Sequence, residues 1–364
     1  MIYSDLFKDV TKFAKKLPTS DYQENGKHPI IDQGQKQIAG YTDIEEGLFS
    51  DVPVIIFGDH TRVIKYIDTP FFIGADGVKV IKCLDKQANY NYLYYLLSSV
   101  RIPNTGYNRH YKWLKEARLV EHTKEEQEKI VAVLSTIDNI LDLYSVQLNK
   151  LDELIKSRFV EMFGDPVHNR MNWNTKPLAE MCKVIVDCPH STPNYTSSNT
   201  GYMCIRTSIV KKNRIMWDKI EYISKDEYYQ RIQRKKPEKG DIIYTREGAI
   251  LGIAAIIDRD CSVALGQRSM LLSPDRSLCT PEFLSVAMNF ETFLNQALNG
   301  ISGSASPHIN VGDVKLFQMI QPPINKQQEY STFVTRIEQQ KATIQQSIDK
   351  LETLKKSLMQ KYFG

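Results

Sequence analysis

The sequence predicts an α+β protein in which two mixed α/β globular segments of similar fold are separated and joined by two long antiparallel coiled-coil helices, in a pseudo-two-fold arrangement. Two stretches carry a long helical period of apolar residues, and each follows a stretch rich in short β-type runs and turn signals. The two helical stretches also end in similar sequences. We therefore expect the order globule, helix, globule, helix over residues 1–122, 123–164, 165–323 and 324–364.

The two long helices are predicted from heptad patterns. In the first, apolar residues alternate by four and three, and neither glycine nor proline occurs between Thr123 and Phe163. The second pattern carries Lys341 and Lys355 at two of its core positions. A helix of about 40 residues, or about 60 Å, is stable only when it buries its apolar stripe. We therefore expect the helices to pack on each other through Ile137, Leu141, Leu148, Leu151, Ile337, Ile344, Ile348 and Leu351.

The repeat extends beyond the helices. LNKLDELIKSRFVEMFG ends at Gly164, and the similar IDKLETLKKSLMQKYFG ends at Gly364. Looser parallels occur before each helix. VPVIIFGDHTRVIKYID resembles GDIIYTREGAILGIAAIID, and FFIGADGVKVIKC resembles CSVALGQRSMLLSP. A short apolar segment that predicts a helix follows in each copy, YNYLYYLLSSV in the first and PEFLSVAMNF in the second. GYNRHYKWLKEARLV and GSASPHINVGDVKLFQMI each place a glycine-containing polar loop before an expected strand. Apolar stripes alone could mean core packing or simple dimerisation, but matching globules favour a chain suited to a ligand with two similar ends.

Composition narrows the class of protein. A net charge of +4 excludes a histone-like polycation, and 42% apolar with 25% charged residues is ordinary for a globular protein. Six cysteines without CxxC spacing argue against a disulfide framework or a four-ligand zinc site. The charged N-terminus and the lack of an eighteen-residue apolar run predict neither a signal peptide nor a membrane span. We expect a cytoplasmic protein.

The sequence lacks the common catalytic motifs. It has no N/D-P-P-Y/F tetrapeptide, since Gln321-Pro322-Pro323-Ile324 lacks both the amide donor and the aromatic ring, and no GxGxxG, GxxxxGK[ST] or HExxH motif. His60 and His190 lie in polar loops, and we expect them to hydrogen-bond within their own turns. The sequence therefore predicts no catalytic residue, no metal site and no cofactor bound by this chain.

Several loops combine cations, aromatics and side chains that can read base edges. Arginine can be bidentate to guanine, asparagine or glutamine to adenine, and lysine can contact phosphate. Most of the basic excess lies in the second globule, although charge alone does not separate a solvated surface from a phosphate-binding one. The predicted DNA-binding residues are Thr61, Arg62, Asn108, Arg109, His110, Lys112, His190, Ser191, Thr192, Asn194, Tyr195, Lys211, Lys212, Arg246, Gln267 and Arg268.

These residues carry a family resemblance. LDELIKSRFVEMFGDP, LETLKKSLMQKYFG and PPINKQQ resemble the two conserved helical regions of type I restriction-modification specificity subunits. VIIFGDHTRVIKYIDTPFFIGADGVKV with NTGYNRHY resembles a first target-recognition domain of that family, and W-x-x-K-P-L, GDIIYTREGAILG and SPHIN resemble a second. One departure is that the first helix is entered through VEHTKEEQ without a proline, which leaves its start uncertain by a few residues.

The resemblance implies a non-catalytic subunit that reads a bipartite site in double-stranded DNA, one half per target-recognition domain. It also implies two methyltransferase subunits that bind S-adenosylmethionine and restriction subunits that use ATP and Mg, with the helix pair setting the unread gap. Two alternatives stay open. One is a coiled-coil DNA-binding scaffold or regulator without restriction partners, and the other is the recognition part of a bifunctional methyltransferase or nuclease.

Overall fold

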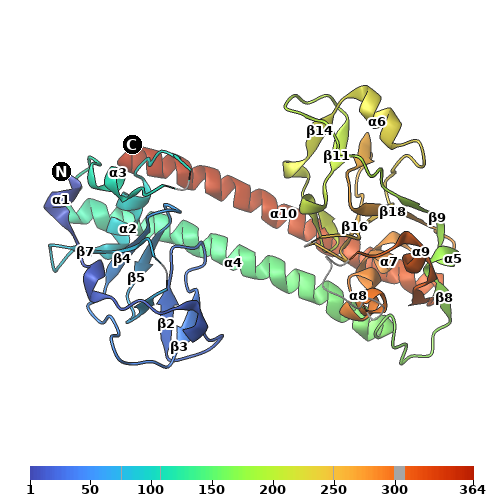
Figure 1. Cartoon of the computed structure of the whole chain (residues 1–364), viewed down its shortest axis with the longest axis horizontal. Helices are drawn as coiled ribbons and strands as arrows, with labels where there is room; N and C mark the ends of the chain where they lie inside the picture. The colour runs from blue at the N-terminus through green and yellow to red at the C-terminus, as the bar shows by residue number, and fades with distance from the viewer. Residues whose placement is uncertain (75, 107, 249, 299–307) are drawn as a thin grey trace. The chain divides into compact units, whose positions relative to one another are not determined.

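The computed structural model describes the chain except for residues 75, 107, 249 and 299–307. It divides into two compact units. Unit 1 comprises Met1–Ser145 and Gln345–Gly364, and unit 2 comprises Val146–Ile344. Each unit therefore contains one globule and half of each long helix (Figure 1).

The long helices are α4 (Lys124–Phe163) and α10 (Ile324–Phe363), each of 40 residues. A capping box starts α4, because the Thr123 amide donates to Glu126 Oε2 at 2.8 Å and the Glu126 amide donates to Thr123 Oγ1 at 3.3 Å. The first helix, which is entered without a proline, therefore begins with a capping box. At the other end, Gly164 adopts a left-handed φ of 75°, which terminates the helix.

Within each unit the two helices run antiparallel. The two lysines that interrupt the apolar seam make ion pairs across it. In unit 2, Lys341 Nζ lies 2.6 Å from Asp152 Oδ1, and in unit 1 Lys355 pairs with Asp138. The aspartates are two heptads apart on α4 and the lysines two heptads apart on α10, so both units use the same helix register. All eight predicted packing residues are buried or half-buried.

One stretch of α4 is long and apolar enough, by length and composition, to cross a membrane, which differs from the expectation above. A single helix of this kind is weak evidence for a membrane span, since core helices of water-soluble proteins pass the same test. Some apolar residues of α4 are buried in the cores of the two units, as described next, whereas Val133, Leu143, Val146, Leu154 and Val160 are exposed.

Unit 1 contains a four-stranded antiparallel sheet in the order β1-β7-β4-β5, and a three-stranded sheet in the order β3-β2-β6 in which β2 and β6 are parallel. Helix α2 begins at the N-cap Asn89, whose side chain accepts from the Tyr92 amide at 3.1 Å. The helices and strands of the globule are α1 (Tyr3–Leu6), β1 (Phe7–Asp9), β2 (His28–Ile31), β3 (Gly40–Thr42), β4 (Val54–Gly58), β5 (Ile64–Ile67), β6 (Phe72–Ile73), β7 (Val78–Cys83), α2 (Tyr90–Ser98) and α3 (Tyr111–Lys115).

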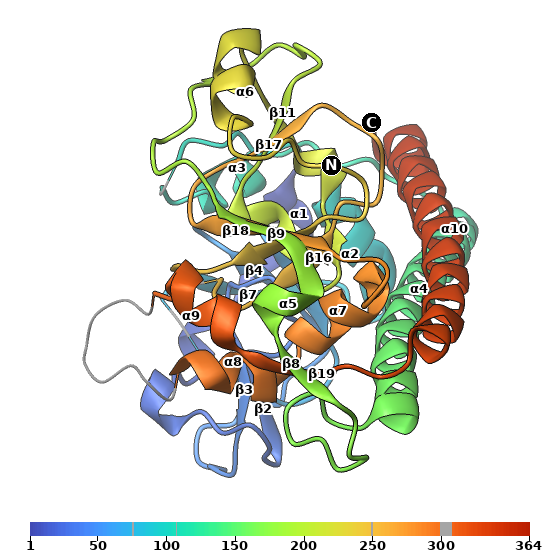
Figure 2. The same cartoon turned by 90° about the vertical axis from the view of Figure 1, so that its right-hand side faces the viewer.

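Unit 2 contains a four-stranded antiparallel sheet in the order β16-β15-β18-β9 and a second sheet in the order β10-β14-β11-β17, in which β11 and β17 are parallel (Figure 2). Its elements are β8 (Thr175–Pro177), α5 (Leu178–Met181), β9 (Cys182–Asp187), β10 (Tyr195–Thr196), β11 (Met203–Ile205), β12 (Val210–Lys211), β13 (Arg214–Ile215), β14 (Glu221–Ile223), α6 (Lys225–Arg231), β15 (Ile242–Thr245), β16 (Ala254–Ile256), β17 (Val263–Leu265), β18 (Ser269–Pro274), α7 (Pro281–Met288), α8 (Glu291–Leu298), α9 (Val311–Leu316) and β19 (Gln318–Ile320).

The two four-stranded sheets have the same strand order and the same register. The pair Gly58–Val78 between β4 and β7 corresponds to the pair Thr245–Ser269 between β15 and β18. Phe57 likewise pairs with Ile64 as Tyr244 pairs with Ala254. The predicted repeat within the globules is thereby confirmed at the level of single residues.

The predicted repeat of a polar loop before a strand is seen in a modified form. Residues 108–110 lead into α3, which is followed by an isolated bridge at Arg118, and residues 308–310 lead into α9, which precedes the strand β19. In α3 the spacing favours a helix, since Tyr111 and Leu114 are three residues apart and a single helical turn buries both on one face. Part of the SPHIN motif, Ser306 and Pro307, lies outside the described residues.

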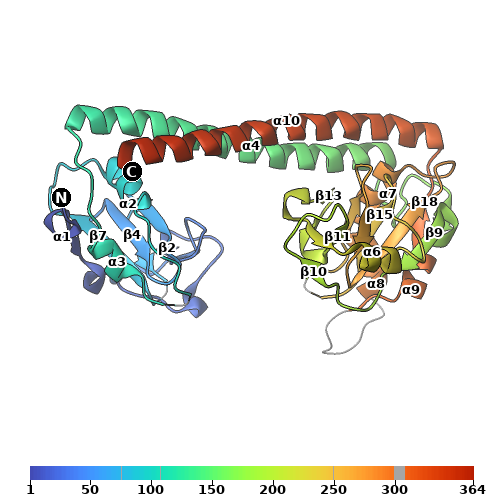
Figure 3. The same cartoon turned by 90° about the horizontal axis from the view of Figure 1, so that it is seen from above.

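An apolar helix attaches each globule to the long helices (Figure 3). In unit 1, residues of α2 share a buried core with Ile130 and Leu134 of α4. In unit 2, the Phe159 ring stacks on Phe283 of α7, with centroids 5.3 Å apart, and Phe163 contacts Tyr330 of α10 at 5.5 Å. These contacts explain why the phenylalanine that ends α4 recurs at the end of α10, where Phe363 packs 5.8 Å from Tyr92.

Candidate nucleic-acid interface

Three loops of unit 1 meet at Asp59, directly after β4. The Asp59 amide donates to the Gly77 carbonyl at 2.7 Å, and the Asp59 carbonyl accepts from the His110 amide at 2.8 Å. The Asp59 side chain, which is buried, accepts from the Tyr111 amide at 2.7 Å. The loops before β7, after β4 and before α3 are thus held together by one residue, and we call this arrangement the loop junction.

Unit 2 builds the same junction around Arg246. The Arg246 amide donates to the Arg268 carbonyl at 3.0 Å, and the Arg246 carbonyl accepts from the Ile309 amide at 2.9 Å. The sheet register places Arg246 where unit 1 has Asp59. Its buried guanidinium lies 3.0 Å from Asp187 Oδ1 and 3.0 Å from Glu247 Oε1. The backbone geometry is therefore repeated, whereas the side chain that fills the junction changes charge.

A second arginine fixes the loop that follows β9. Arg231 of α6 is buried and donates from Nη2 to the Ser191 carbonyl at 2.9 Å and from Nε to Glu227 Oε1 at 3.0 Å. Glu227 in turn accepts from the Asn194 amide at 3.1 Å. Gln267 Nε2 donates to the His190 carbonyl at 2.6 Å, so the loops 187–195 and 266–268 are joined directly. The outward side chains of these loops are therefore presented on a fixed backbone.

Most of the predicted DNA-binding residues reach solvent. Of the residues that reach solvent, all five in unit 1 and most of those in unit 2 lie on or beside the loops that meet at the loop junctions. Thr61, Arg62, Asn108, Arg109, Lys112, His190, Ser191, Thr192, Asn194, Tyr195, Lys211, Lys212, Gln267 and Arg268 are exposed or half-exposed. Tyr107, within the loop 105–112, lies outside the described residues.

Lys211 and Lys212 lie elsewhere in unit 2. They belong to the β12–β13 hairpin, whose Asn213 amide donates to the Ala254 carbonyl of β16 at 2.8 Å. The Asn213 side chain also accepts from Asn289 Nδ2 at 2.7 Å, next to α7. Because β16 and β9 are opposite edges of the sheet, the structure does not bring these lysines together with the loop that follows β9.

Two predicted contact residues are corrected by their burial. His110 has no exposed surface, and its Nδ1 lies 2.9 Å from the Asp59 carbonyl oxygen. Arg246 is 2% exposed and held by the carboxylates already described. Both side chains are buried within the junction, so we interpret them as residues that position the loops.

The two loop histidines differ in their partners. His190 Nε2 lies 3.1 Å from Asp187 Oδ2 in its own turn, as predicted. His60 Nδ1 lies 3.2 Å from the carbonyl oxygen of Asn108, on another loop.

Sequence reasoning missed Gln33, which supports the loop after β4. Its Oε1 accepts from the His60 amide at 3.1 Å, and its backbone carbonyl accepts from Thr61 Oγ1 at 2.6 Å. The signal was present, because DQGQKQ (residues 32–37) is a glycine-containing polar loop like those that were singled out.

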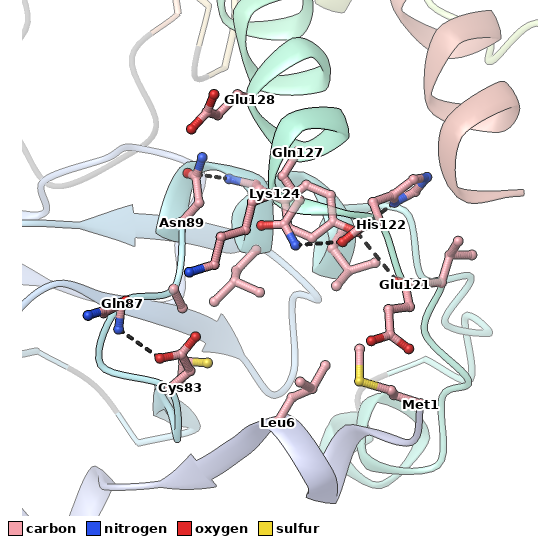
Figure 4. A pocket seen from close by; sticks show the side chains of 16 residues that line it. Met1, Leu6, Cys83, Gln87, Asn89, Glu121, His122, Lys124, Gln127 and Glu128 are labelled. Atoms are coloured by element: carbon pink, nitrogen blue, oxygen red, sulfur yellow. Dashed lines mark hydrogen bonds between the residues drawn. The ribbon is translucent and has the colours of Figure 1, made fainter.

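A pocket of about 180 Å³ lies apart from these loops, between β7, α2 and the start of α4 (Figure 4). Its one histidine, His122, has Nδ1 2.7 Å from the Tyr92 hydroxyl, and Gln127 Nε2 donates to the His122 carbonyl at 3.0 Å. These hydrogen bonds join the globule to the start of α4, so we interpret them as structural contacts.

Comparison with known proteins decides the family. Residues 171–353, half of the chain, match the model of the family described as "Type I restriction modification DNA specificity domain". The chain belongs to this family. The match includes the unit 2 junction, α7 and most of α10, so the unit 2 part of the candidate interface lies within the matched domain and the unit 1 junction lies outside it.

Relatives of this specificity domain are distant in sequence. The chain is 26% identical over 158 residues to the "Type I restriction enzyme EcoR124I/EcoR124II specificity subunit" of Escherichia coli, covering 42% of this chain and 39% of that protein. It is 20% identical over 249 residues to the "Type I restriction enzyme MjaVIII specificity subunit" of Methanocaldococcus jannaschii, covering 65% and 58%. The chain thus spans less than two thirds of the length of either relative.

The fold is similar to that of a solved specificity subunit. The S subunit of a type I restriction-modification system from M. genitalium gives a TM-score of 0.55 at 16% identity, over 100% of this chain and 95% of that one. The mixed α/β globules and the antiparallel long helices are thereby confirmed as the fold of this family.

Proposed function

We propose that this chain is a non-catalytic specificity subunit that reads a bipartite site in double-stranded DNA, with one half read by each unit. The observation that carries the proposal is the repeated loop junction. The same hydrogen bonds hold three loops in both units, while the outward side chains differ. A shared scaffold with different loops is what recognition of two unlike half-sites requires.

The residues around the junctions suit the grooves of DNA. In unit 1, Thr61, Arg62, Asn108 and Arg109 reach solvent beside Asp59, and they include guanidinium and amide groups that can read guanine and adenine. In unit 2, Asn194, Gln267 and Arg268 offer the same chemistry. Lysine and backbone contacts to phosphate would set the register on the duplex.

The proposal includes partners. As a specificity subunit, the chain would hold two methyltransferase subunits that bind S-adenosylmethionine, and restriction subunits that use ATP and Mg, in the cytoplasm. The two long helices would set the length of the unread gap between the half-sites. The lysine–aspartate pairs across the seam support this role, because polar groups in a helix seam specify register.

Methylome sequencing of host strains with and without the gene tests the proposal. We expect adenine methylation at one bipartite motif to disappear when the gene is deleted and to return when it is supplied. The purified chain alone, given S-adenosylmethionine, ATP and Mg, is expected neither to methylate nor to cleave DNA. An unchanged methylome in the deletion strain, whose methyltransferase genes are intact, would contradict the proposal.

A further inference from the structure

Two arginines adopt a backbone conformation that is unfavourable for them. Among the described residues, five that are not glycine have a left-handed φ, and three of these are asparagines, a residue type that tolerates this region. The other two are Arg62, with φ 63°, and Arg268, with φ 65°. An arginine pays a conformational cost here that a glycine avoids, and such strain is typical of functional positions.

The two arginines lie at the loop junctions, one in each unit. The sheet register makes Gly252 the counterpart of Arg62 and Gly77 the counterpart of Arg268. Both counterparts are glycines with left-handed φ, of 75° and 84°. Each junction therefore has the same two left-handed positions, and in each unit one is glycine and the other is arginine, with the two positions exchanged.

Packing explains why each unit carries arginine at one position alone. A Cβ atom at Gly77 would lie 2.7 Å from His60 Cδ2, and a Cβ atom at Gly252 would lie 2.4 Å from Leu294 Cδ1. Side chains at these two positions would therefore collide with residues of their own unit. A side chain at Gly77 would require His60 to move, and one at Gly252 would require Leu294 to move.

The two guanidinium groups are available to a ligand. Arg268 is exposed, and it lies beside Gly248, where an added Cβ would meet Arg268 Nη1 at 3.5 Å. Arg62 is half-exposed, and its Nη1 donates to the Ile102 carbonyl in a long contact of 3.4 Å. Within the described part of the chain neither arginine makes an ion pair, whereas Arg206, Arg231 and Arg246 all pair with carboxylates.

From this geometry we infer that Arg62 and Arg268 are the principal specificity-determining arginines, one for each half-site, and that each reads a guanine. The inference rests on the proposed function and names the residues that carry it out. A planar guanidinium with several donors matches the O6 and N7 acceptors of guanine in the major groove. The left-handed backbone holds each arginine at the edge of its junction, at the cost of local strain.

The test uses the full chain assembled with its methyltransferase subunits and DNA duplexes bearing the methylated target. Anisotropy titrations at one fixed salt concentration compare the intact target with duplexes in which either half-site is scrambled. Arg268→Gly should weaken binding about 10- to 100-fold and abolish discrimination at one half-site only. Arg62→Gly should do the same at the other half-site, and lysine at either position should retain part of the affinity but lose discrimination.

Thermal unfolding separates this role from a structural one. At positions 62 and 268 the glycine variant should be more stable than the alanine variant, because glycine relieves the left-handed strain. Arg259 is a matched control, because it is exposed, has an ordinary φ and pairs with Asp258 at 3.0 Å. There alanine should be at least as stable as glycine, and DNA binding should be unchanged.

Two results would overturn the inference. One is affinity and half-site discrimination within about twofold of the parent in both glycine variants, and the other is a single variant that weakens both half-sites equally. Failure of the unaltered complex to discriminate its target would instead contradict the proposed function, before any arginine is replaced.

Discussion

The two units build one backbone arrangement with different chemistry. In unit 1 the junction is filled by a carboxylate, Asp59, which accepts a single amide hydrogen bond from Tyr111. In unit 2 the same place is taken by Arg246, which is surrounded by Asp187, Glu247 and the ring of His308. The strand register and the loop-to-loop hydrogen bonds are nevertheless the same.

This difference shows which interactions the architecture requires. The backbone hydrogen bonds are common to both units, and they fix where the loops leave the sheet. The side chain at each junction occupies a buried space: Asp59 accepts from the Tyr111 amide, and Arg246 pairs with Asp187 and Glu247, although Arg246 Nε and Asp187 Oδ1 make no hydrogen bond. Side chains that point outward are then free to differ between the units, which is the property that a reader of two unlike half-sites needs.

The largest difference between the units should appear when the junction side chain is removed. Arg246→Ala leaves the half-buried carboxylates of Asp187 and Glu247 without their cation, and we expect a loss of about 3 kcal/mol in the free energy of unfolding, the lower end for a buried pair. Asp59→Ala removes one hydrogen bond and should cost about 1–3 kcal/mol. Urea denaturation followed by circular dichroism measures both.

Asp59→Asn is the matched control, since its amide oxygen can still accept from the Tyr111 amide, and it should recover most of the loss. Equal costs for Arg246→Ala and Asp59→Ala would mean that the two junctions are not held as differently as their charges indicate.

The first turns of α4 and α10 provide a second comparison. Gln327 is fully buried, accepts from the Thr280 amide at 3.0 Å and donates to the carbonyls of Leu278 and Pro322. Gln127, its counterpart in the repeat, is half-buried and donates to His122 alone. Gln327→Ala should therefore cost about 2–3 kcal/mol and Gln127→Ala about 0.5 kcal/mol. Similar values from thermal unfolding of the two variants would show that these helix starts are equally anchored.

Cysteine labelling can follow the units separately. Cys83 reports on unit 1 and Cys279 on unit 2, and burial raises the pKa of both thiols, that of Cys279 to about 12. A raised pKa leaves little reactive thiolate at pH 8, so iodoacetamide should modify the half-exposed Cys261 first and the buried thiols only after local opening. Arg246→Ala should accelerate labelling of Cys279 and leave that of Cys83 unchanged, as peptide mass spectrometry can show. Equal acceleration at both sites would mean that the units open together.

The sequence predicted the helices well, because a period sustained over many turns is a strong local signal. Lys341 and Lys355 looked like interruptions of that signal, since a sequence does not reveal that each faces an aspartate on the other helix. The order of the strands and the division into two units depend on long-range pairing, which the internal repeat indicated but could not specify.

Within the candidate site, the sequence identified the loops better than the roles of their residues. His110 and Arg246 were predicted to contact DNA, because a polar residue in a loop carries no local sign of being buried. Arg62 and Arg268 were chosen from their chemistry alone. Their left-handed backbone, which distinguishes them from the other arginines, is visible only in the folded chain.

Exchange of loops in one unit is the most direct test of the claim that the units are separate readers. The outward residues of 187–195, 245–248 and 266–269 would be replaced by those of a relative, while Asp187 and Arg246 are kept so that the junction still forms. Methylome sequencing of the host should then show one half of the bipartite motif rewritten, with the other half and the gap length unchanged. A motif rewritten in both halves would contradict the account, because it would mean that the two units read DNA jointly.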